Sequence, residues 1–498
     1  MSRINTNVPS LLGQRVLAQN NRTLNTSLER LSTGLRINRG ADDPAGLIAS
    51  ENLRSEKASI TAAISNAERA EQVVNVAEGG LQEVNNLLLE VQALVGRSAN
   101  EAGLSIEEKQ ANQLQIDSIL QTIDRISETT SFQGTKLLNG NYDFNVKDQA
   151  STVESVDVNA AKIPAGEERD IKVLVTQSAQ NAGLFLSTGA SLDLADAEST
   201  LVFDLAGTLG SREFSFASGT SITDIAATIN TFSDLTGLSA TASGGGVKIQ
   251  SIGLGSNEYV SVDIRDAGGG AGGIGTLTAN AAETRSSDAA TTFIAASNPI
   301  RDEGQDIGAT INGSAATTNG TTARIASDFL DVEIDLSKAG SQALASIDAV
   351  TVEGGGANFN LGPNVDIGNQ VSIGIQSIAS RNLGSDNTGF LSKLASGQDF
   401  NVVDGDLNTA QKIVNDSIDE ITTLRGRLGA FQKNTVGATI RSLGVALENT
   451  SAAESAIRDT DFAAETAALT RGQILVQAAT NVLSIANSQP QNALSLLG

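Results

Sequence analysis

The chain has 498 residues, a formal net charge of −24 at pH 7, and no cysteine, histidine or tryptophan. So acidic a surface repels phosphate backbones and anionic lipids, and we expect no nucleic-acid binding and no membrane insertion. The lack of cysteine excludes disulfides and thiolate-held metals, and the lack of histidine removes the usual general base and zinc ligand.

The first part of the chain, up to about residue 140, has the apolar periodicity of long helices. Its first apolar seam consists of Leu17, Leu24, Leu28, Leu31 and Leu35. Pro44 follows two aspartates, which is typical of a helix start. The second seam then keeps the repeat of a coiled coil, and Gly79-Gly80 within it predicts a local softening. This seam runs through Ile60, Ile64, Ala67, Ala70, Val74, Ala77, Leu81, Val84, Leu88, Val91 and Val95.

The middle of the chain, from about 145 to 400, is rich in Gly, Ala, Ser, Thr and Asp and carries most of the negative charge. Alternating apolar runs predict strands at 201–205, 213–216, 246–250, 259–264, 331–336 and 370–376. A capped helix is expected at 220–230, where Ile222, Ile225, Ala226 and Ile229 share one face. We therefore expect one or two compact β-rich domains inserted between two helical halves.

Helical periodicity returns after about residue 405. One seam consists of Val414, Ile418, Ile421, Leu424, Leu428 and Phe431. A last helix, around 466–487, carries Leu469, Ile474, Leu475, Ala478, Val482 and Ile485. Each apolar stripe is too narrow and too long to be buried by its own helix, so each needs partners. The expected fold class is α+β, with a long helical coiled-coil or bundle core that pairs the N- and C-terminal segments.

The sequence contains no catalytic constellation. The glycine-rich run 268–275 fits G-x-G-x-x-G, but no helix start follows it, so we expect a flexible surface loop rather than a dinucleotide site. The acidic pairs Asp42-Asp43 and Glu107-Glu108 suit helix starts better than acid–base catalysis. Residues 399–406 lack the terminal glutamate of a calcium loop. We expect no enzyme activity, no cofactor and no metal.

Five short strings are more specific than any periodicity. They are LSTGLRIN (31–38), DDPAG (42–46), IRDTDF (457–462), RGQIL (471–475) and PQNALSLL (490–497). Together they resemble bacterial flagellin, the subunit of the flagellar filament. The resemblance covers roughly 1–144 and 405–498, whereas the middle resembles the family only in type, with a flagellin-type insert near 200–265.

The resemblance implies three parts. Residues 1–43 and 456–498 would form a terminal coiled-coil assembly domain, and 44–144 with 400–455 a helical rod domain with a small β element. Residues 145–399 would form a variable, acidic, surface-exposed β-rich region. The assembly interface would include Leu17, Leu24, Leu28, Leu31, Leu35, Arg36, Ile37, Asn38, Ile474, Leu475, Ala478, Val482, Ile485, Leu494, Leu496 and Leu497. The rod seam would include Ile60, Ile64, Val74, Leu81, Val84, Leu88, Val91, Val95, Ile418, Ile421, Leu424, Leu428 and Phe431.

The resemblance also implies a function. Copies of the chain would polymerise head to tail into an extracellular helical filament for swimming motility. The N-terminal residues lack the apolar core of a cleavable signal, which fits export, unfolded, through the flagellar secretion channel and assembly at the tip. Implied partners are an export chaperone, the export apparatus, the filament cap and the hook–filament junction proteins.

Three alternative functions fit parts of the same pattern. A hook–filament junction protein shares the N-terminal pattern and the rod but usually ends differently, so the string at 490–497 favours the filament subunit. An enzyme carried on a filament would need catalytic groups that the composition lacks. A membrane-active amphipathic protein would need more basic polar faces.

One region departs from the family pattern. Flagellins that the vertebrate flagellin receptor detects usually present arginine at the place of Glu90, a polar residue at that of Leu89, and a leucine at that of Leu94. This chain keeps Leu94 but reverses the charge at Glu90. We therefore expect weak or absent activation of that receptor.

Overall fold

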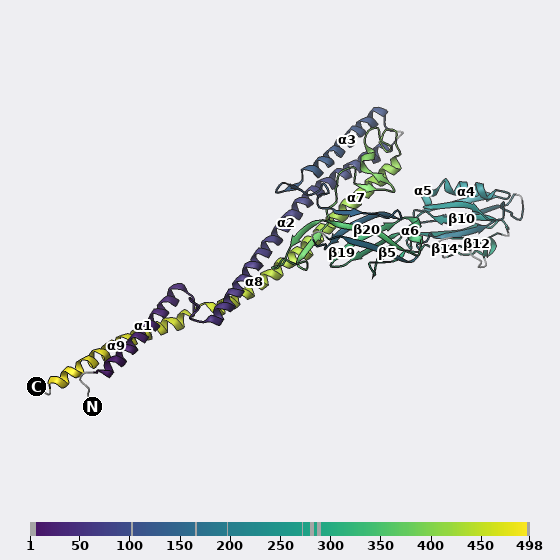
Figure 1. Ribbon diagram of the computed structural model, residues 1–498. Coiled ribbons are helices and arrows are strands. Elements are labelled where there is room, and N and C mark those ends of the chain that lie inside the picture. The colour runs from purple at the N-terminus through teal and green to yellow at the C-terminus, as the bar shows by residue number, and fades with distance from the viewer. Residues whose placement is uncertain are drawn as a thin grey trace. The chain divides into compact units, whose positions relative to one another are not determined.

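The computed structural model describes residues 6–100, 103–164, 167–196, 198–270, 272–278, 283–285 and 290–495. Long helices lie at both ends of the sequence and strands in the middle, so the predicted α+β class is confirmed (Figure 1). The chain divides into two units. The terminal unit comprises residues 1–72, 360–369 and 430–498, and the central unit comprises 73–359 and 370–429.

Most of the terminal unit is helical. Asn7 caps the first helix by accepting a hydrogen bond from the Ser10 N–H, and Gly34 ends that helix in the left-handed conformation that glycine adopts without strain. An isolated β-bridge between Leu35 and Asp459 follows. The helices are α1 (Val8–Thr33), the first part of α2 (Pro44–Ser98), α8 (Gly437–Arg458) and α9 (Phe462–Ser495), with a π-helical segment at Phe431–Val436.

The helical part of the central unit consists of the rest of α2, α3 (Ile106–Thr129) and α7 (Leu407–Ala430), with a small hairpin of β1 (Ser131–Phe132) and β2 (Thr135–Lys136). Ser105 and Glu108 form a capping box at the start of α3, so the acidic residues there serve the helix start. Helix α2 is continuous through Gly79-Gly80, and the local softening there stays a prediction. A Cβ at Gly80 would lie 2.7 Å from the Leu138 side chain, so this glycine permits close packing on α2.

An inner β-domain follows in the same unit. Its two antiparallel sheets have the orders β16-β15-β5-β20-β3 and β17-β18-β19-β4 and share one core. In β19, alternate residues Leu330, Val332, Ile334 and Leu336 are buried in that core. The strands are β3 (Phe144–Lys147), β4 (Val153–Ala161), β5 (Arg169–Gln177), β15 (Gly308–Ile311), β16 (Ser314–Ala315), β17 (Thr317–Asn319), β18 (Thr322–Ala326), β19 (Leu330–Leu336) and β20 (Ser346–Gly355), with α6 (Lys338–Gln342) after β19.

An outer β-domain is inserted between β5 and β15. Its sheets have the orders β13-β12-β6-β10-β9 and β14-β11-β7-β8 and enclose a second core. In this core the ring centroid of Phe203 lies 5.9 Å from that of Phe214 and 6.0 Å from that of Phe216. The elements are β6 (Gly183–Ser187), β7 (Thr200–Ala206), β8 (Ser211–Ala217), α4 (Ile222–Asn230), α5 (Ser233–Thr236), β9 (Leu238–Ser243), β10 (Gly246–Ser251), β11 (Tyr259–Asp266), β12 (Gly273–Thr276), β13 (Thr291–Thr292) and β14 (Ile300–Glu303).

Short ribbons lead from the inner β-domain back to the helices. They are β21 (Ala357–Asn360) with β22 (Gln370–Ile373), and β23 (Gly384–Ser385) with β24 (Gly389–Phe390). The strand predicted at 370–376 is therefore shorter than expected, because Gly374 instead donates a hydrogen bond to the Asn159 carbonyl.

The other predicted strands, and the helix α4, are confirmed with shifts of a residue or two at their ends. The loop predicted for the glycine-rich run is wrong in its second half, which forms β12. A Cβ at Gly272 would lie 2.5 Å from the Ser187 carbonyl oxygen, so close approach of backbone requires the glycine.

Candidate assembly surfaces

Helices α1 and α9 lie side by side and antiparallel in the terminal unit (Figure 1). Near the start of α1, the Asn7 side chain donates to the Ala486 carbonyl at 2.8 Å. Near its end, Arg30 forms an ion pair with Glu465 at 3.7 Å. Polar contacts at both ends therefore set the register of the pair.

Small residues form the contact face between the two helices. A Cβ at Gly13 would lie 3.3 Å from the Leu483 side chain, and one at Gly472 would lie 3.5 Å from that of Leu24. Ser10 and Ser27 are buried on the same face of α1. The sequence analysis included Leu24 but missed the small residues of this face, because it followed large apolar side chains. Positions 10, 13, 20, 24 and 27 are three, seven, four and three residues apart, which is a helical repeat.

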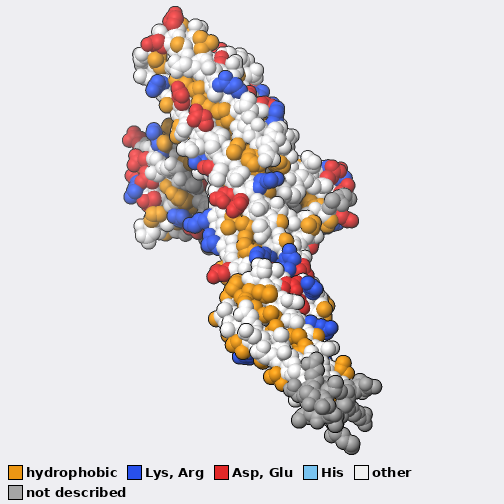
Figure 2. Space-filling view, turned by 90° about the vertical axis from the view of Figure 1, so that its left-hand side faces the viewer, with side chains coloured by type: hydrophobic (Ala, Val, Ile, Leu, Met, Phe, Trp, Pro, Cys, Tyr) orange, Lys and Arg blue, Asp and Glu red, His pale blue; other side chains and the backbone are white. Residues whose placement is uncertain are grey.

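The predicted stripe of α9 is exposed in the single chain. Relative exposure is 63% for Ile474, 57% for Val482 and 61% for Ile485, and apolar side chains are visible over the terminal helices in Figure 2. Part of the stripe lines an apolar groove of about 460 Å³ between α9 and α1. It is lined by Pro9, Leu12, Gly13, Val16, Asn20, Leu475, Ala478, Ala479, Val482, Ile485, Ala486 and Gln489. The pairing of α1 with α9 thus leaves a long apolar surface uncovered.

The predicted interface residues of α1 are less exposed. Leu17, Leu24, Leu31, Leu35 and Asn38 are half-buried, whereas Leu28 is exposed. Two neighbours in the same string differ: Ile37 is buried, and the exposed Arg36 donates to the Ile457 carbonyl at 2.6 Å. The side chains predicted at Leu494, Leu496 and Leu497 lie outside the part of the chain that the structure describes.

The predicted rod seam is buried along most of its length. In the central unit, the buried members of α2 and α7 are Val74, Leu81, Val84, Leu88, Val91, Val95, Ile421, Leu424 and Leu428, with Ile418 half-buried. In the terminal unit, Ile60 and Phe431 are buried and Ile64 is half-buried. The predicted receptor region lies on α2, where Leu89 and Glu90 are exposed and Leu94 is buried.

The central unit also holds a cleft of about 600 Å³ that sequence reasoning did not anticipate. It lies where α7 meets the inner β-domain, and carboxylates outnumber guanidinium groups in its lining. Its charged groups are Asp143, Glu154, Asp157, Arg324, Glu333, Asp335, Asp386, Asp416, Asp419, Glu420 and Arg427. These residues come from distant segments of the sequence, so no local motif could have revealed the cleft.

Within this cleft, Glu420 is the carboxyl group with the largest change in acidity. Burial raises the pKa of Glu420 to about 7, and the neighbouring carboxylates of Asp157 and Asp143 act in the same direction. The Gly384 N–H, which donates to Glu420 at 3.2 Å, and the Arg427 guanidinium oppose the shift. Because Glu420 is half-buried among other carboxylates, its protonated form is favoured over the ionised one.

Two further observations concern membranes and metal ions. Among the helices that the structure describes, none is long and apolar enough to cross a bilayer. The described residues also contain no cluster of three or more acidic side chains arranged to hold a metal ion.

The helical ends match known family models. The model described as the bacterial flagellin N-terminal helical region matches residues 4–143, and the one for the C-terminal helical region matches 411–497. The B-type flagellin of Pseudomonas aeruginosa is 32% identical over 99% of both chains. The chain belongs to the bacterial flagellins. A flagellin from Salmonella choleraesuis is 28% identical, again over 99% of both chains.

Among solved structures, FliC from Burkholderia pseudomallei aligns with 73% of this chain and 99% of its own length, at 14% identity. Its TM-score of 0.23 is too low to support any structural argument. Full-length similarity to flagellins makes the chain a subunit of the extracellular flagellar filament, which serves motility. The hook–filament junction alternative has less support, because the Pseudomonas and Salmonella relatives are flagellins that match along their whole length.

Proposed function

We propose that neighbouring copies join the filament through the exposed stripe of α9 and its adjacent groove. The observation that carries this proposal is the exposure of Ile474, Val482 and Ile485 in a helix already paired with α1. An uncovered apolar stripe of this length marks an interaction surface. A second copy is the occupant because a flagellin meets its own copies at every position of the filament, and such non-closing contacts propagate.

The same proposal assigns a role in the filament to each part of the chain. Residues 1–43 and 456–498 form the assembly domain, 44–144 and 400–455 form the rod, and 145–399 form the exposed exterior. The buried seams of α2 and α7 support the rod assignment, and the two separate β-cores support a modular exterior. The protein acts as a structural subunit and not as an enzyme.

Export and assembly partners complete the proposal. The chain leaves the cell unfolded through the flagellar channel, escorted by an export chaperone, and folds at the tip beneath the filament cap. The junction proteins of the hook provide its first contact. Family membership supports these assignments, together with the absence of cysteine, since no disulfide can form before threading.

Thiol labelling tests the proposed surface. Because the chain has no cysteine, Ile485→Cys introduces a unique thiol in the exposed stripe. Its reaction with a maleimide is expected to slow by roughly tenfold or more on polymerisation, because a packed interface excludes the reagent. Ala227→Cys, exposed on α4, serves as a control that reacts at similar rates in monomer and filament. Equal reactivity of the thiol introduced in the stripe in both states would contradict the proposal.

We also propose that Glu90 weakens detection by the vertebrate flagellin receptor. Glu90 is exposed on α2 beside Leu89, so a partner would meet its charge directly. Glu90→Arg is expected to lower the half-maximal activating concentration by roughly tenfold in a reporter-cell assay, since a charge at an interface alters encounter and fit. Glu83→Arg, exposed two turns earlier on the same face of α2, makes the same charge change outside positions 89–94. Full potency of the parent chain, or an equal gain with Glu83→Arg, would refute the role of Glu90.

A further inference from the structure

The outer β-domain is joined to the inner one by two chain segments that run side by side. Gln180 and Gln305 pair in an isolated antiparallel bridge, with N–H to carbonyl distances of 2.8 and 3.0 Å. Domains connected in this way ordinarily move relative to one another unless their interface restrains them. The contacts around the double connection therefore decide whether the two β-domains move independently.

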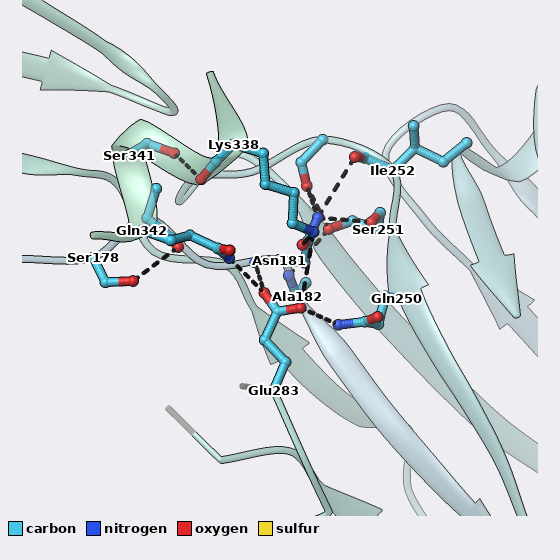
Figure 3. A network of polar contacts seen from close by, with 12 residues as sticks. Ser178, Asn181, Ala182, Gln250, Ser251, Ile252, Glu283, Lys338, Ser341 and Gln342 are labelled. Carbon is cyan, nitrogen blue, oxygen red and sulfur yellow. Dashed lines mark hydrogen bonds and ion pairs between the residues drawn. The ribbon is translucent and has the colours of Figure 1, made fainter. Parts of the chain in front are cut away.

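Glu283 provides the first restraint (Figure 3). The residue is 5% exposed, and its carboxylate accepts hydrogen bonds from the Asn181 N–H at 3.0 Å and from the Gln250 side chain at 2.6 Å. From α6 of the inner domain, Gln342 donates to it at 3.4 Å and the Lys338 ammonium lies 4.0 Å away. Lys338 also donates to the Asn181 side-chain oxygen at 2.7 Å. One buried carboxylate thus links α6 to β10 and to the connection itself.

The backbone of Glu283 supports a specific role for this residue. Its φ of +42° lies in the left-handed region, which is uncommon for a residue other than glycine. Strain of this kind persists only where the surroundings hold the residue in place. A buried carboxylate is also costly unless hydrogen bonds satisfy it, and here several do.

Asp306 provides the second restraint, at a different element of the inner domain. One carboxylate oxygen accepts from the Ser256 N–H and from the Gly320 N–H, both at 2.8 Å, and the other accepts from the Ser256 hydroxyl at 2.6 Å. Next to it, the Asn257 side chain donates to that of Asn319 at 2.9 Å. Asp306 therefore connects the β10–β11 loop of the outer domain with the β17–β18 turn of the inner domain.

Backbones at this second restraint come very close together. A Cβ at Gly255 would lie 2.6 Å from the Gly320 Cα, and one at Gly304 would lie 2.3 Å from the Gly255 carbonyl oxygen. The glycines allow the Asp306 carboxylate to reach both backbone N–H groups at once. The close backbones thus bring the groups that donate to Asp306 within reach of its carboxylate.

We propose that Glu283 and Asp306 are two carboxylate clasps that make the inner and outer β-domains one rigid arm. With a single clasp, the outer β-domain could still rotate relative to the inner one about the line between that clasp and the double connection. Because the two clasps hold different elements, α6 and the β17–β18 turn, they remove that remaining freedom. The exterior of each subunit is then presented in one orientation.

Distance measurements between spin labels on the full-length monomer test the proposal. The cysteine-free chain allows labels at Ala227→Cys on α4 and Ala326→Cys on β18, both exposed and in different β-domains. The parent is expected to give a narrow distance distribution. Glu283→Ala combined with Asp306→Ala is expected to widen it at least twofold, with each single variant in between. Asp234→Ala, an exposed carboxylate of α5, is the matched control and leaves the width unchanged.

A second label pair separates loss of the clasps from loss of folding. Ala227→Cys with Ser211→Cys reports within the outer domain, where the width stays that of the parent if the domain remains folded. A parent-like width between the domains in the double alanine variant overturns the proposal. Should the outer domain itself loosen, Lys338→Ala combined with Ser256→Ala removes one exposed side-chain partner from each clasp and is judged by the same criterion.

Discussion

Replacing Val482 and Ile485 together by aspartate is expected to abolish polymerisation and to leave the monomer folded. Both side chains are exposed in the single chain, so the substitution removes nothing from a core. In a filament, two unpaired carboxylates would be buried against a neighbour at a cost of several kcal/mol. A loss of about 4 kcal/mol per contact weakens association roughly a thousandfold. Seeded polymerisation followed by sedimentation and negative-stain microscopy measures the effect.

A charge-matched variant controls for added negative charge. Gln477→Asp with Thr480→Asp adds the same two charges at the same spacing, on the side of α9 away from the groove and from α1. This variant is expected to polymerise far better than the stripe variant. Deletion of residues 456–498 should behave like the stripe variant. Filaments from either the stripe variant or the truncated chain would refute the assembly surface.

Glu420→Gln is expected to stabilise the central unit at pH 8 by about 1–2 kcal/mol, a value discounted for partial solvent access. Burial raises the folded-state pKa of Glu420 to about 7 from an ordinary 4.5, so the ionised form opposes folding. The stabilising contribution of Glu420 is therefore complete below pH 4.5 and is lost as the pH rises through about 7. Glutamine keeps an acceptor for the Gly384 N–H and carries no charge.

Denaturant unfolding at several pH values from about 5 to 8 checks this expectation. The stability difference between Glu420→Gln and the parent should grow with pH across that window. Glu83→Gln removes a carboxylate that is exposed on α2, and should shift stability little and equally at every pH. A constant difference for Glu420→Gln would show that Glu420 does not titrate in the acidic cleft.

The long seams could be predicted from sequence because their information is local. Leu81, Val84, Leu88 and Val91 recur at helical spacing, and large apolar residues with that repeat have few alternatives to burial against another helix. Periodicity does not say which helices pack together. The resemblance of the short terminal sequence strings to flagellin supplied that information. Alternation likewise predicted β7, β8 and β19, because each has one face in a core.

Other features depend on neighbours that are distant in sequence. Gly13 and Gly472 meet opposing side chains that no pattern around them indicates, and small residues give a weak apolar signal. The acidic cleft joins α7 to β4 and β19, so its charges are scattered along the chain. The composition around Gly272 is typical of a loop. The strand found there depends on the close approach of the Ser187 backbone, which cannot be inferred from the glycine-rich run itself.

The bridge between Gln180 and Gln305 makes the outer β-domain an exchangeable cassette. The two ends of the insertion are already hydrogen-bonded to each other, so a short turn could replace everything between them without moving β5 or β15. Among the residues that the structure describes, the fully buried members of the inner core include none from the inserted segment, and the partly buried Leu254 is the one side chain of that segment that packs against it. Insertions of very different length and surface could therefore be exchanged at this point, and the helical ends would not have to change with them.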